Sequence, residues 1–301
     1  MHRGAVVVLG PDGGLLEAVG AVDRPVLPRS SNKPVQATAL LEAGWVPAKE
    51  RELAIAAGSH SGEDAHREVV AGMLATAGLG PAHLGCPPAL PIHEPTRARW
   101  LVEGRDPDRV AMNCSGKHAG MLSACVAAGW PVEGYLERDH PLQQAIEARL
   151  SDAAGEPVAA VVVDGCGAPQ HGLTLGGLAR GVLSLVSAPE GDRRRAVADA
   201  MRAFPWFVAG TGRDDTELMT AVPGMLVKGG ADGVHVAAVP GLGAVALKLE
   251  DGGDRGRTPA LCAGLRRLGV PMDALGSWLL TPVLGGGRVV GEVRPGAALT
   301  L

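Results

Sequence analysis

A serine and a lysine near the amino terminus have a spacing that can activate a hydroxyl group. In Arg29-Ser30-Ser31-Asn32-Lys33-Pro34, Ser30 and Lys33 are three positions apart and would share one face of a helix. A neutral lysine can take the proton of such a serine, and the helix N-terminus favours the negative charge that develops nearby. The alternative is structural, because serine and asparagine are common N-cap residues.

The loop Gly58-Ser59-His60-Ser61-Gly62-Glu63 offers a second serine. Ser59 could relay a proton or bind substrate beside the first segment. Ser61 has an ordinary alternative role, since it could cap the following helix in a box with Asp64. Ser59 is therefore the candidate for chemistry in this loop.

A second lysine lies at the end of a predicted strand, in Val227-Lys228-Gly229-Gly230. Serine penicillin-recognising enzymes place a strand lysine, in a K-T-G motif, opposite their S-x-x-K pair. Here glycine replaces the threonine, and a lysine that precedes a glycine-rich turn is also ordinary. Lys228 becomes a candidate through its place in the order of the motifs, with Lys248 as a competitor.

Two short patterns pair a cysteine with another potential metal ligand. Lys117 follows Cys114 by three residues, and Asp164 precedes Cys166 by two. Two thiolates, a carboxylate and a nitrogen could complete a tetrahedral zinc site. The alternative is a pair of small buried cysteines beside tight glycine turns.

Composition narrows the class of protein. The 301 residues are 46% apolar with a net charge of -4, so the chain is expected to be globular, with no general attraction to nucleic acid or anionic membranes. No run approaches the roughly 20 apolar residues of a membrane span. Five cysteines, an odd number, predict free thiols and a cytoplasmic location. Only five of the 28 basic residues are lysines, and lysine, unlike arginine, can lose its proton when buried.

The elements that must position these residues form a simple order. Turn residues 11–14 predict a hairpin at the amino terminus, and further strands separated by glycine turns follow residue 222. Candidate helices cover about 34–43, 49–57, 63–77, 96–103, 116–128, 141–154, 173–186 and 191–203, and one buried strand is expected over 158–163. The prediction is an α+β fold: one antiparallel sheet built from both chain ends, with a helical middle. A single domain, 1–301, is expected, with the terminal strands and the region of about 30–220 as its two possible lobes.

With these segments in view, the sequence resembles the asparaginase II family, typified by the inducible rhizobial L-asparaginase. The matching motifs run in order through almost the whole chain: Arg-Ser-Ser-Asn-Lys-Pro-Val-Gln (29–36), Ser-His-Ser-Gly-Glu (59–63), Asn-Cys-Ser-Gly-Lys-His-Ala-Gly-Met-Leu (113–122), Gly-Tyr-Leu followed by His-Pro-Leu-Gln (134–143), Asp-Gly-Cys-Gly-Ala-Pro (164–169), Gly-Arg-Asp-Asp-Thr-Glu-Leu-Met (212–219) and Lys-Gly-Gly-Ala-Asp-Gly (228–233). The resemblance implies a serine-β-lactamase/glutaminase-like fold. It also implies hydrolysis of the side-chain amide of L-asparagine to L-aspartate and ammonia by a homodimeric enzyme.

The resemblance also implies roles for individual residues. The catalytic set would be Ser30 as nucleophile, Lys33 as its base, and Ser59 and Lys228 as a second Ser–Lys pair. The zinc ligands, for about one ion per chain, would be Cys114, Lys117, Asp164 and Cys166. Arg29 and His118 would lie beside the substrate.

The chain departs from the family pattern in two places. Members begin upstream of the position of His2, so we expect either a shortened first strand or a misplaced start site. The segment Val110-Ala111-Met112 stands where the family often carries a histidine and an asparagine, so that wall of the site is expected to differ.

Alternative functions remain open. A penicillin-recognising serine hydrolase or a glutaminase would share the Ser–Lys arrangement. An asparaginase of the N-terminal-threonine type would need self-cleavage before a residue such as Thr211. A zinc-binding module without catalysis would need only the cysteine segments.

Overall fold

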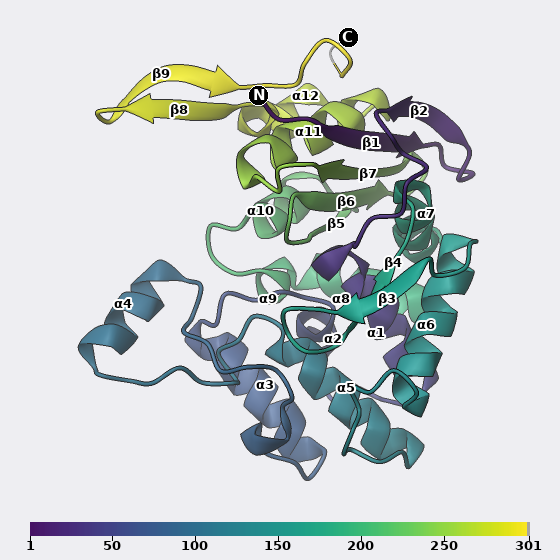
Figure 1. The fold of residues 1–301 in the computed structure, drawn as a ribbon, viewed down its shortest axis with the longest axis vertical. Helices are drawn as coiled ribbons and strands as arrows, with labels where there is room; N and C mark the ends of the chain where they lie inside the picture. The colour runs from purple at the N-terminus through teal and green to yellow at the C-terminus, as the bar shows by residue number, and fades with distance from the viewer. Residues whose placement is uncertain (300–301) are drawn as a thin grey trace.

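A five-stranded antiparallel sheet lies at one end of the molecule in the computed structural model, which describes residues 1–299 (Figure 1). Its order is β2-β1-β7-β6-β5, so strands from the two ends of the chain pair directly. The bounds are β1 Gly4–Leu9, β2 Leu15–Val19, β5 Leu226–Gly229, β6 Val234–Val239 and β7 Gly243–Leu249. The predicted α+β class, with one sheet built from both chain ends, is confirmed.

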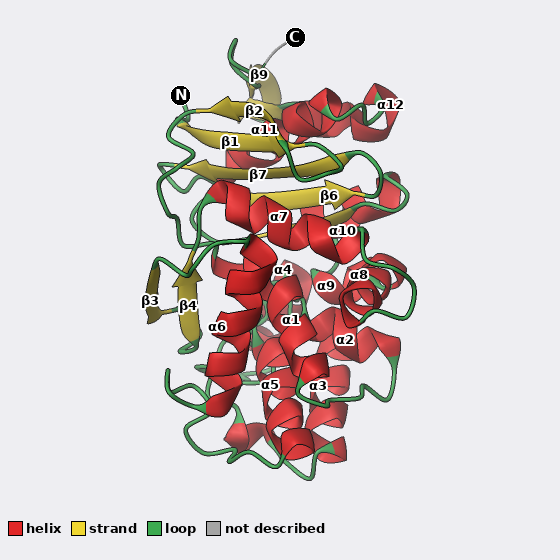
Figure 2. Ribbon diagram, turned by 90° about the vertical axis from the view of Figure 1, so that its right-hand side faces the viewer, coloured by secondary structure: helices red, strands yellow, loops and turns green. Residues whose placement is uncertain are grey.

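Helices cover both faces of this sheet. Helix α7 (Leu175–Val186) packs against β6 and β7, as Figure 2 shows, and α11 (Asp254–Arg267) also packs against these two strands. Every residue of β6 is buried. Five of its six residues are apolar, as burial on both faces favours, and the exception is His235, whose Nε2 lies 3.0 Å from Asp215 Oδ1.

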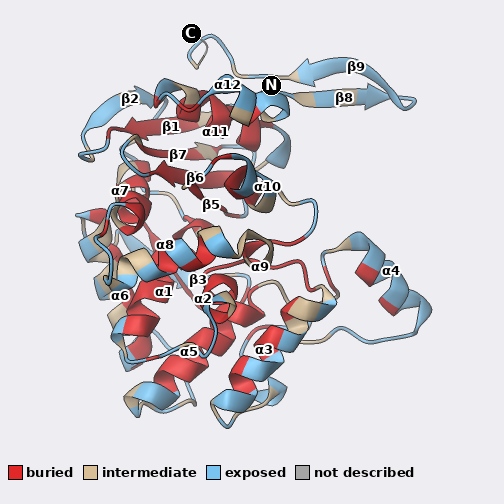
Figure 3. Ribbon diagram, turned by 180° about the vertical axis from the view of Figure 1, so that it is seen from behind, coloured by how far each residue is buried: buried red, intermediate tan, exposed pale blue. Residues whose placement is uncertain are grey.

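The remaining helices form the larger part of the molecule, and Figure 3 shows that their buried faces point inward, where apolar side chains form the core. Their bounds are α1 Lys33–Glu42, α2 Glu50–Ala56, α3 Asp64–Thr76, α4 Glu94–Val102, α5 Ser115–Ala128, α6 Pro141–Ala154, α8 Arg193–Ala203, α9 Pro205–Val208, α10 Asp214–Ala221 and α12 Met272–Leu275. Short 3-10 helices are η1 Arg29–Asn32, η2 Pro81–His83 and η3 Gly276–Leu279. The eight predicted helices are confirmed within a few residues.

The strand predicted over 158–163 is present as a shorter strand, but the prediction that it is buried is wrong. Among residues 1–299, strand β3 (Ala160–Val163) pairs only with β4 (Pro169–Gly172), and Val163 is 78% exposed. An apolar run of this length does not reveal which layer will cover it. A second hairpin, β8 (Thr281–Gly285) with β9 (Arg288–Val293), was not predicted.

Two broad expectations can be compared with the structure. All five cysteines are free thiols, as predicted. Within residues 1–299 there is no helix that combines the length and the apolar character needed to cross a membrane.

A close approach of two helices positions part of the candidate site. A Cβ atom added at Gly116 of α5 would lie 2.5 Å from the carbonyl oxygen of Ile55 in α2. Only glycine allows this approach, which sets the start of α5 against the loop that follows α2. Cys114 and Lys117 belong to that start, and Ser59 belongs to that loop.

We therefore expect Gly116→Ala to destabilise the protein by about 1–3 kcal/mol, since the helices must separate. Gly72 of α3 is the matched control, because an added Cβ meets no atom within 4 Å there. Gly72→Ala should stabilise by up to about 1 kcal/mol. Urea unfolding measures both changes, and a neutral Gly116→Ala variant would contradict the packing described.

Candidate functional site

The chain turns sharply just before the candidate nucleophile. Arg29 has a φ of 55°, in the left-handed region that arginine rarely adopts. Ser30 follows within η1 and is half-buried, and its hydroxyl makes no hydrogen bond to any residue in the described part of the chain. Backbone strain of this kind is concentrated at functional sites.

The capping alternative for this segment is wrong. The N-cap of α1 is Asn32, and its side chain makes no capping hydrogen bond. Ser30 therefore begins the helix region without serving it as a cap. The Ser61 alternative is also wrong, because Glu63 is the N-cap of α3 and forms its capping box with His66.

Lys33 is the centre of the buried polar contacts. Its Nζ atom lies 2.7 Å from the carbonyl oxygen of Gly58, 2.8 Å from Ser59 Oγ and 3.3 Å from Cys114 Sγ. The side chain is only 2% exposed. One amine thus connects the first turn of α1, the Ser59 loop and the start of α5.

Ser59 is held in place through its backbone. Its N–H donates to the carbonyl oxygen of Val208 at 2.7 Å, and Gly58 packs so tightly on Val208 that a Cβ would meet that oxygen at 2.6 Å. The neighbouring Ser61 instead donates its hydroxyl to Ala209. Of the two loop serines, Ser59 is the one bonded to a candidate lysine.

Lys228 does not pair with Ser59. Its Nζ atom contacts Asp215 Oδ2 at 2.9 Å and the carbonyl oxygen of Gly229 at 2.7 Å. The expected second Ser–Lys pair is therefore absent as a hydrogen bond between these described residues, because Ser59 is bonded to Lys33. The competitor Lys248 ends on the carbonyl oxygens of Asp232 and Leu249.

The surroundings of Lys228 are strongly charged. Burial lowers the pKa of Lys228, and Asp215 opposes that effect. Burial alone would raise the pKa of Asp215, but the Lys228 ammonium and His235 hold it well below its usual value. The geometry is that of a buried ion pair.

The four predicted metal ligands lie together. Donor atoms of Cys114, Asp164 and Cys166 are all within 4.8 Å of one another. Lys117 Nζ is 3.1 Å from Cys166 Sγ, which in turn is 3.2 Å from Asp164 Oδ2. Two sulfurs, a carboxylate oxygen and an amine nitrogen form a donor set that suits zinc.

The two cysteines of this cluster differ in acidity. The neighbouring Cys166 thiol, followed by the positive charges of Lys33 and Lys117 when these are protonated, lowers the pKa of Cys114 well below its ordinary value despite burial. Cys114 and burial together raise the pKa of Cys166 to about 11. Thiolate character therefore concentrates on Cys114, next to Lys33.

Tyr135 fixes the orientation of His118. The backbone N–H of Gly85 donates to the Tyr135 hydroxyl at 2.8 Å, and that hydroxyl lies 2.6 Å from His118 Nδ1. Because burial lowers the pKa of His118 to about 4, its ring is neutral at pH 7 and the tyrosine donates to Nδ1. His118 Nε2 then carries the hydrogen, and this buried atom has no hydrogen-bond partner among the described residues.

Arg29 is held by two carboxylates. Its Nε donates to Asp164 Oδ1 at 2.7 Å, and its guanidinium also contacts Asp232. Asp164 thus joins the arginine to the cysteine cluster.

The sequence analysis did not single out Asp232, Tyr135 or Asp215, although all three lie in the family motifs. Asp215 directly follows Asp214, and such an acidic doublet is typical of a helix start.

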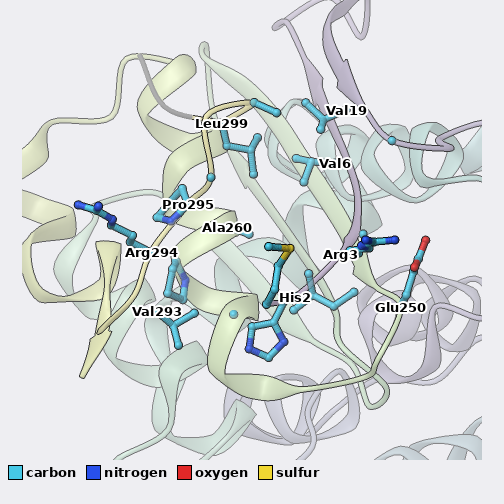
Figure 4. Close-up of a pocket in the computed structure, with 18 of the residues that line it drawn as sticks. His2, Arg3, Val6, Val19, Glu250, Ala260, Val293, Arg294, Pro295 and Leu299 are labelled. Carbon is cyan, nitrogen blue, oxygen red and sulfur yellow. The ribbon is translucent and has the colours of Figure 1, made fainter. Parts of the chain in front are cut away.

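An open cavity elsewhere does not compete with this site. It has a volume of about 820 Å³ and lies between β1, the start of α11 and the segment after β9 (Figure 4). His2, Arg3, Glu250 and Arg294 line it, but no serine, cysteine or lysine does so in the described part of the chain. It therefore has no side chain suited to the nucleophilic chemistry considered above.

A buried histidine beside the site predicts a pH dependence of stability. Burial, with the charges of Arg138 and Lys117, lowers the pKa of His171 to about 4, whereas the unfolded value is 6.5. The unfolded chain therefore binds the proton first, and stability falls as pH decreases from about 6.5 toward 4.

Between about pH 7 and pH 5, this histidine should account for about 2 kcal/mol of lost stability. His171→Gln, which is neutral throughout, should remove that part of the pH dependence. Urea unfolding at the two pH values measures it. An identical loss in both proteins would show that His171 does not cause it.

Comparison with known proteins places the sequence in a family. The model of the L-asparaginase II family matches residues 1–295. Among proteins whose functions have been curated, none matches.

Solved structures show distant similarity. Mglu in its native form is 15% identical with a TM-score of 0.47, over 83% of this chain and 59% of that chain. A β-lactamase from Mycobacterium bovis is 15% identical with a TM-score of 0.45, over 83% of this chain and 88% of that chain. The chain thus spans 59% of the length of native Mglu. Since the family model extends over nearly all of the sequence, the chain belongs to the L-asparaginase II family.

Proposed function

We propose that this protein hydrolyses the side-chain amide of L-asparagine to L-aspartate and ammonia. One observation carries the proposal: the buried Lys33 amine lies 2.8 Å from Ser59 Oγ and one helical turn from the half-buried Ser30. Family membership supports the same reaction. The homodimer and the cytoplasmic location remain predictions.

In the proposed mechanism Ser30 is the nucleophile and Lys33 is the base. Gly58 O can only accept a hydrogen bond, so a neutral Lys33 would donate to it and direct its lone pair toward Ser59 Oγ. Ser59 is then suited to pass the Ser30 proton to Lys33. Neither hydroxyl needs a second base.

The covalent steps balance without a co-reactant. Ser30 Oγ attacks the amide carbonyl, and its proton passes to Lys33. Collapse of the tetrahedral intermediate releases ammonia with that proton and leaves an ester on Ser30. Water then cleaves the ester, giving L-aspartate and the free hydroxyl.

The charged ends of asparagine have candidate partners nearby. Arg29 provides a guanidinium for the α-carboxylate, and Asp232, which contacts it, provides a carboxylate for the α-ammonium. The unpartnered Nε2–H of His118 offers a further donor. These groups would orient the amide toward Ser30.

We also propose that Cys114, Lys117, Asp164 and Cys166 hold one zinc ion. The fit rests on their donor atoms: those of Cys114, Asp164 and Cys166 lie within 4.8 Å of one another, and Lys117 Nζ is 3.1 Å from Cys166 Sγ. Zinc in this place would be a Lewis acid that fixes Cys114 as a thiolate. The chain's own residues would keep Cys114 against Lys33 and Asp164 against Arg29.

Replacing the nucleophile tests the activity. Ser30→Ala should lower kcat for asparagine by at least about a thousandfold and leave the circular dichroism spectrum unchanged. Ser59→Ala should lower kcat by about 10²–10⁴-fold. Ser31→Ala, at the neighbouring buried hydroxyl, is the control and should stay within about tenfold of wild type.

Ammonia release is measured with L-asparagine and L-glutamine, and β-lactam hydrolysis with nitrocefin. Near-normal ammonia release by Ser30→Ala would disprove its role as nucleophile. Nitrocefin turnover without asparagine turnover would favour the penicillin-recognising alternative.

Elemental analysis tests the zinc proposal. The purified protein should contain about one zinc per chain, and Cys114→Ala/Cys166→Ala should contain none. Cys125→Ala, in the same helix α5 but outside the cluster, should retain the metal. Wild-type protein that binds no zinc after equilibration with it would contradict the proposal.

A further inference from the structure

The region around Lys228 contains a second buried network that the mechanism above does not use. Lys228 and Asp215 are each 1% exposed and form an ion pair. Asp215 accepts hydrogen bonds from Lys228, from the backbone N–H of Gly229 at 2.8 Å and from His235 Nε2 at 3.0 Å. A carboxylate with this many donors is strongly held as an anion.

The adjacent aspartate has different partners. Asp214 Oδ2 accepts from Arg257 at 2.7 Å and from Thr258 at 3.0 Å. Asp214 has no contact with Lys228 among these hydrogen bonds and ion pairs. The two adjacent aspartates at the start of α10 therefore bind different cations, and of the two only Asp215 contacts Lys228.

The two buried lysines near Ser30 have unlike partners. Lys33 contacts a carbonyl oxygen, a hydroxyl and a thiol. Lys228 contacts a carboxylate and a carbonyl oxygen. A carboxylate partner stabilises the ammonium form of a lysine.

The position of Lys228 connects this ion pair to the nucleophile. Lys228 lies on β5, and β5 packs against η1, which contains Ser30. A positive charge on this strand therefore lies on an element that packs directly against the segment of the proposed nucleophile.

We propose that Asp215 is a positioning residue that keeps Lys228 protonated, so that Lys228 serves as a fixed cation for the negative charge of the substrate or the intermediate and not as a second base. The inference rests on the proposed amide hydrolysis. It replaces the expected Ser59–Lys228 pair with a Lys228–Asp215 pair and leaves proton transfer to Lys33.

The charges that face Lys228 give the sign of the effect. Asp215 on α10 favours the ammonium form, while burial and Arg213 disfavour it, as does Lys33 on α1 whenever Lys33 is protonated. His235 on β6 faces the same carboxylate. In Asp215→Asn only the disfavouring influences remain, so Lys228 should lose its proton at a lower pH.

The first experiment compares pH–rate profiles of wild type, Asp215→Asn and Asp214→Asn. If Lys228 works as a cation, the alkaline limb of kcat/KM in Asp215→Asn should move down by about one pH unit or more. Asp214→Asn should keep the wild-type profile shape, whatever its overall rate. An acid limb that moves down instead would show that Lys228 is a base, and a uniform loss with an unchanged profile would show a structural role; either result overturns the proposal.

A second pair of variants applies if Asp215→Asn does not fold. Lys228→Arg retains the positive charge and cannot act as a base near neutral pH. It should keep at least about a tenth of the wild-type kcat/KM, whereas Lys228→Gln should lose at least about a hundredfold. Equal loss in both variants would overturn the proposal.

A direct reading of protonation separates this inference from the proposed function. With [ε-¹³C]lysine the chain has only five labelled side chains, and the signal lost in Lys228→Arg identifies Lys228. The pH at which half of Lys228 has lost its proton should be lower in Asp215→Asn than in wild type. Equal titration midpoints in the two proteins would contradict the ion-pair role. Wild type that releases no ammonia from any amide, but shows this shift, would refute the proposed function and not the ion pair.

Discussion

The burial of Lys33 is the constraint on which the site depends. An amine removed from water must find polar partners, and the three that it finds belong to separate parts of the chain: Gly58, Ser59 and Cys114. The close packing of α5 on α2 at Gly116 allows those partners to meet. Loss of that packing would leave a buried amine without its acceptors, so the fold and the site are stabilised by the same contacts.

The electrostatics of the site follow from how its buried charges are paired. Lys228 is balanced by Asp215, Arg257 by Asp214, and Arg29 by Asp164 and Asp232. Of the two proposed catalytic lysines, Lys33 is the one without a carboxylate partner in the described contacts. This difference in partners is the basis for the proposed roles of Lys33 as a general base and Lys228 as a fixed cation.

Local spacing predicted those parts of the site that lie within one turn or loop. Ser30 and Lys33 sit at one helix start, and Cys114 with Lys117 at another, so sequence separation nearly determines their relation. Sequence order does not determine which segments pair across the fold. Lys228 was therefore matched with the wrong partner, because Asp215 reaches it from α10, an element that the sequence did not predict. The burial of β3 was predicted wrongly for a related reason, because apolar content alone does not show which layer covers a strand.

Trapping the covalent intermediate is the most direct test of the central claim that Ser30 forms an ester during amide hydrolysis. Wild-type protein mixed with L-asparagine, quenched in acid within one turnover and digested, should show the mass of one aspartyl group on the peptide that carries Ser30. Ser30→Ala treated in the same way should show none. Ammonia release at the normal rate without an adduct, or an adduct on the peptide that carries Ser59, would contradict the account.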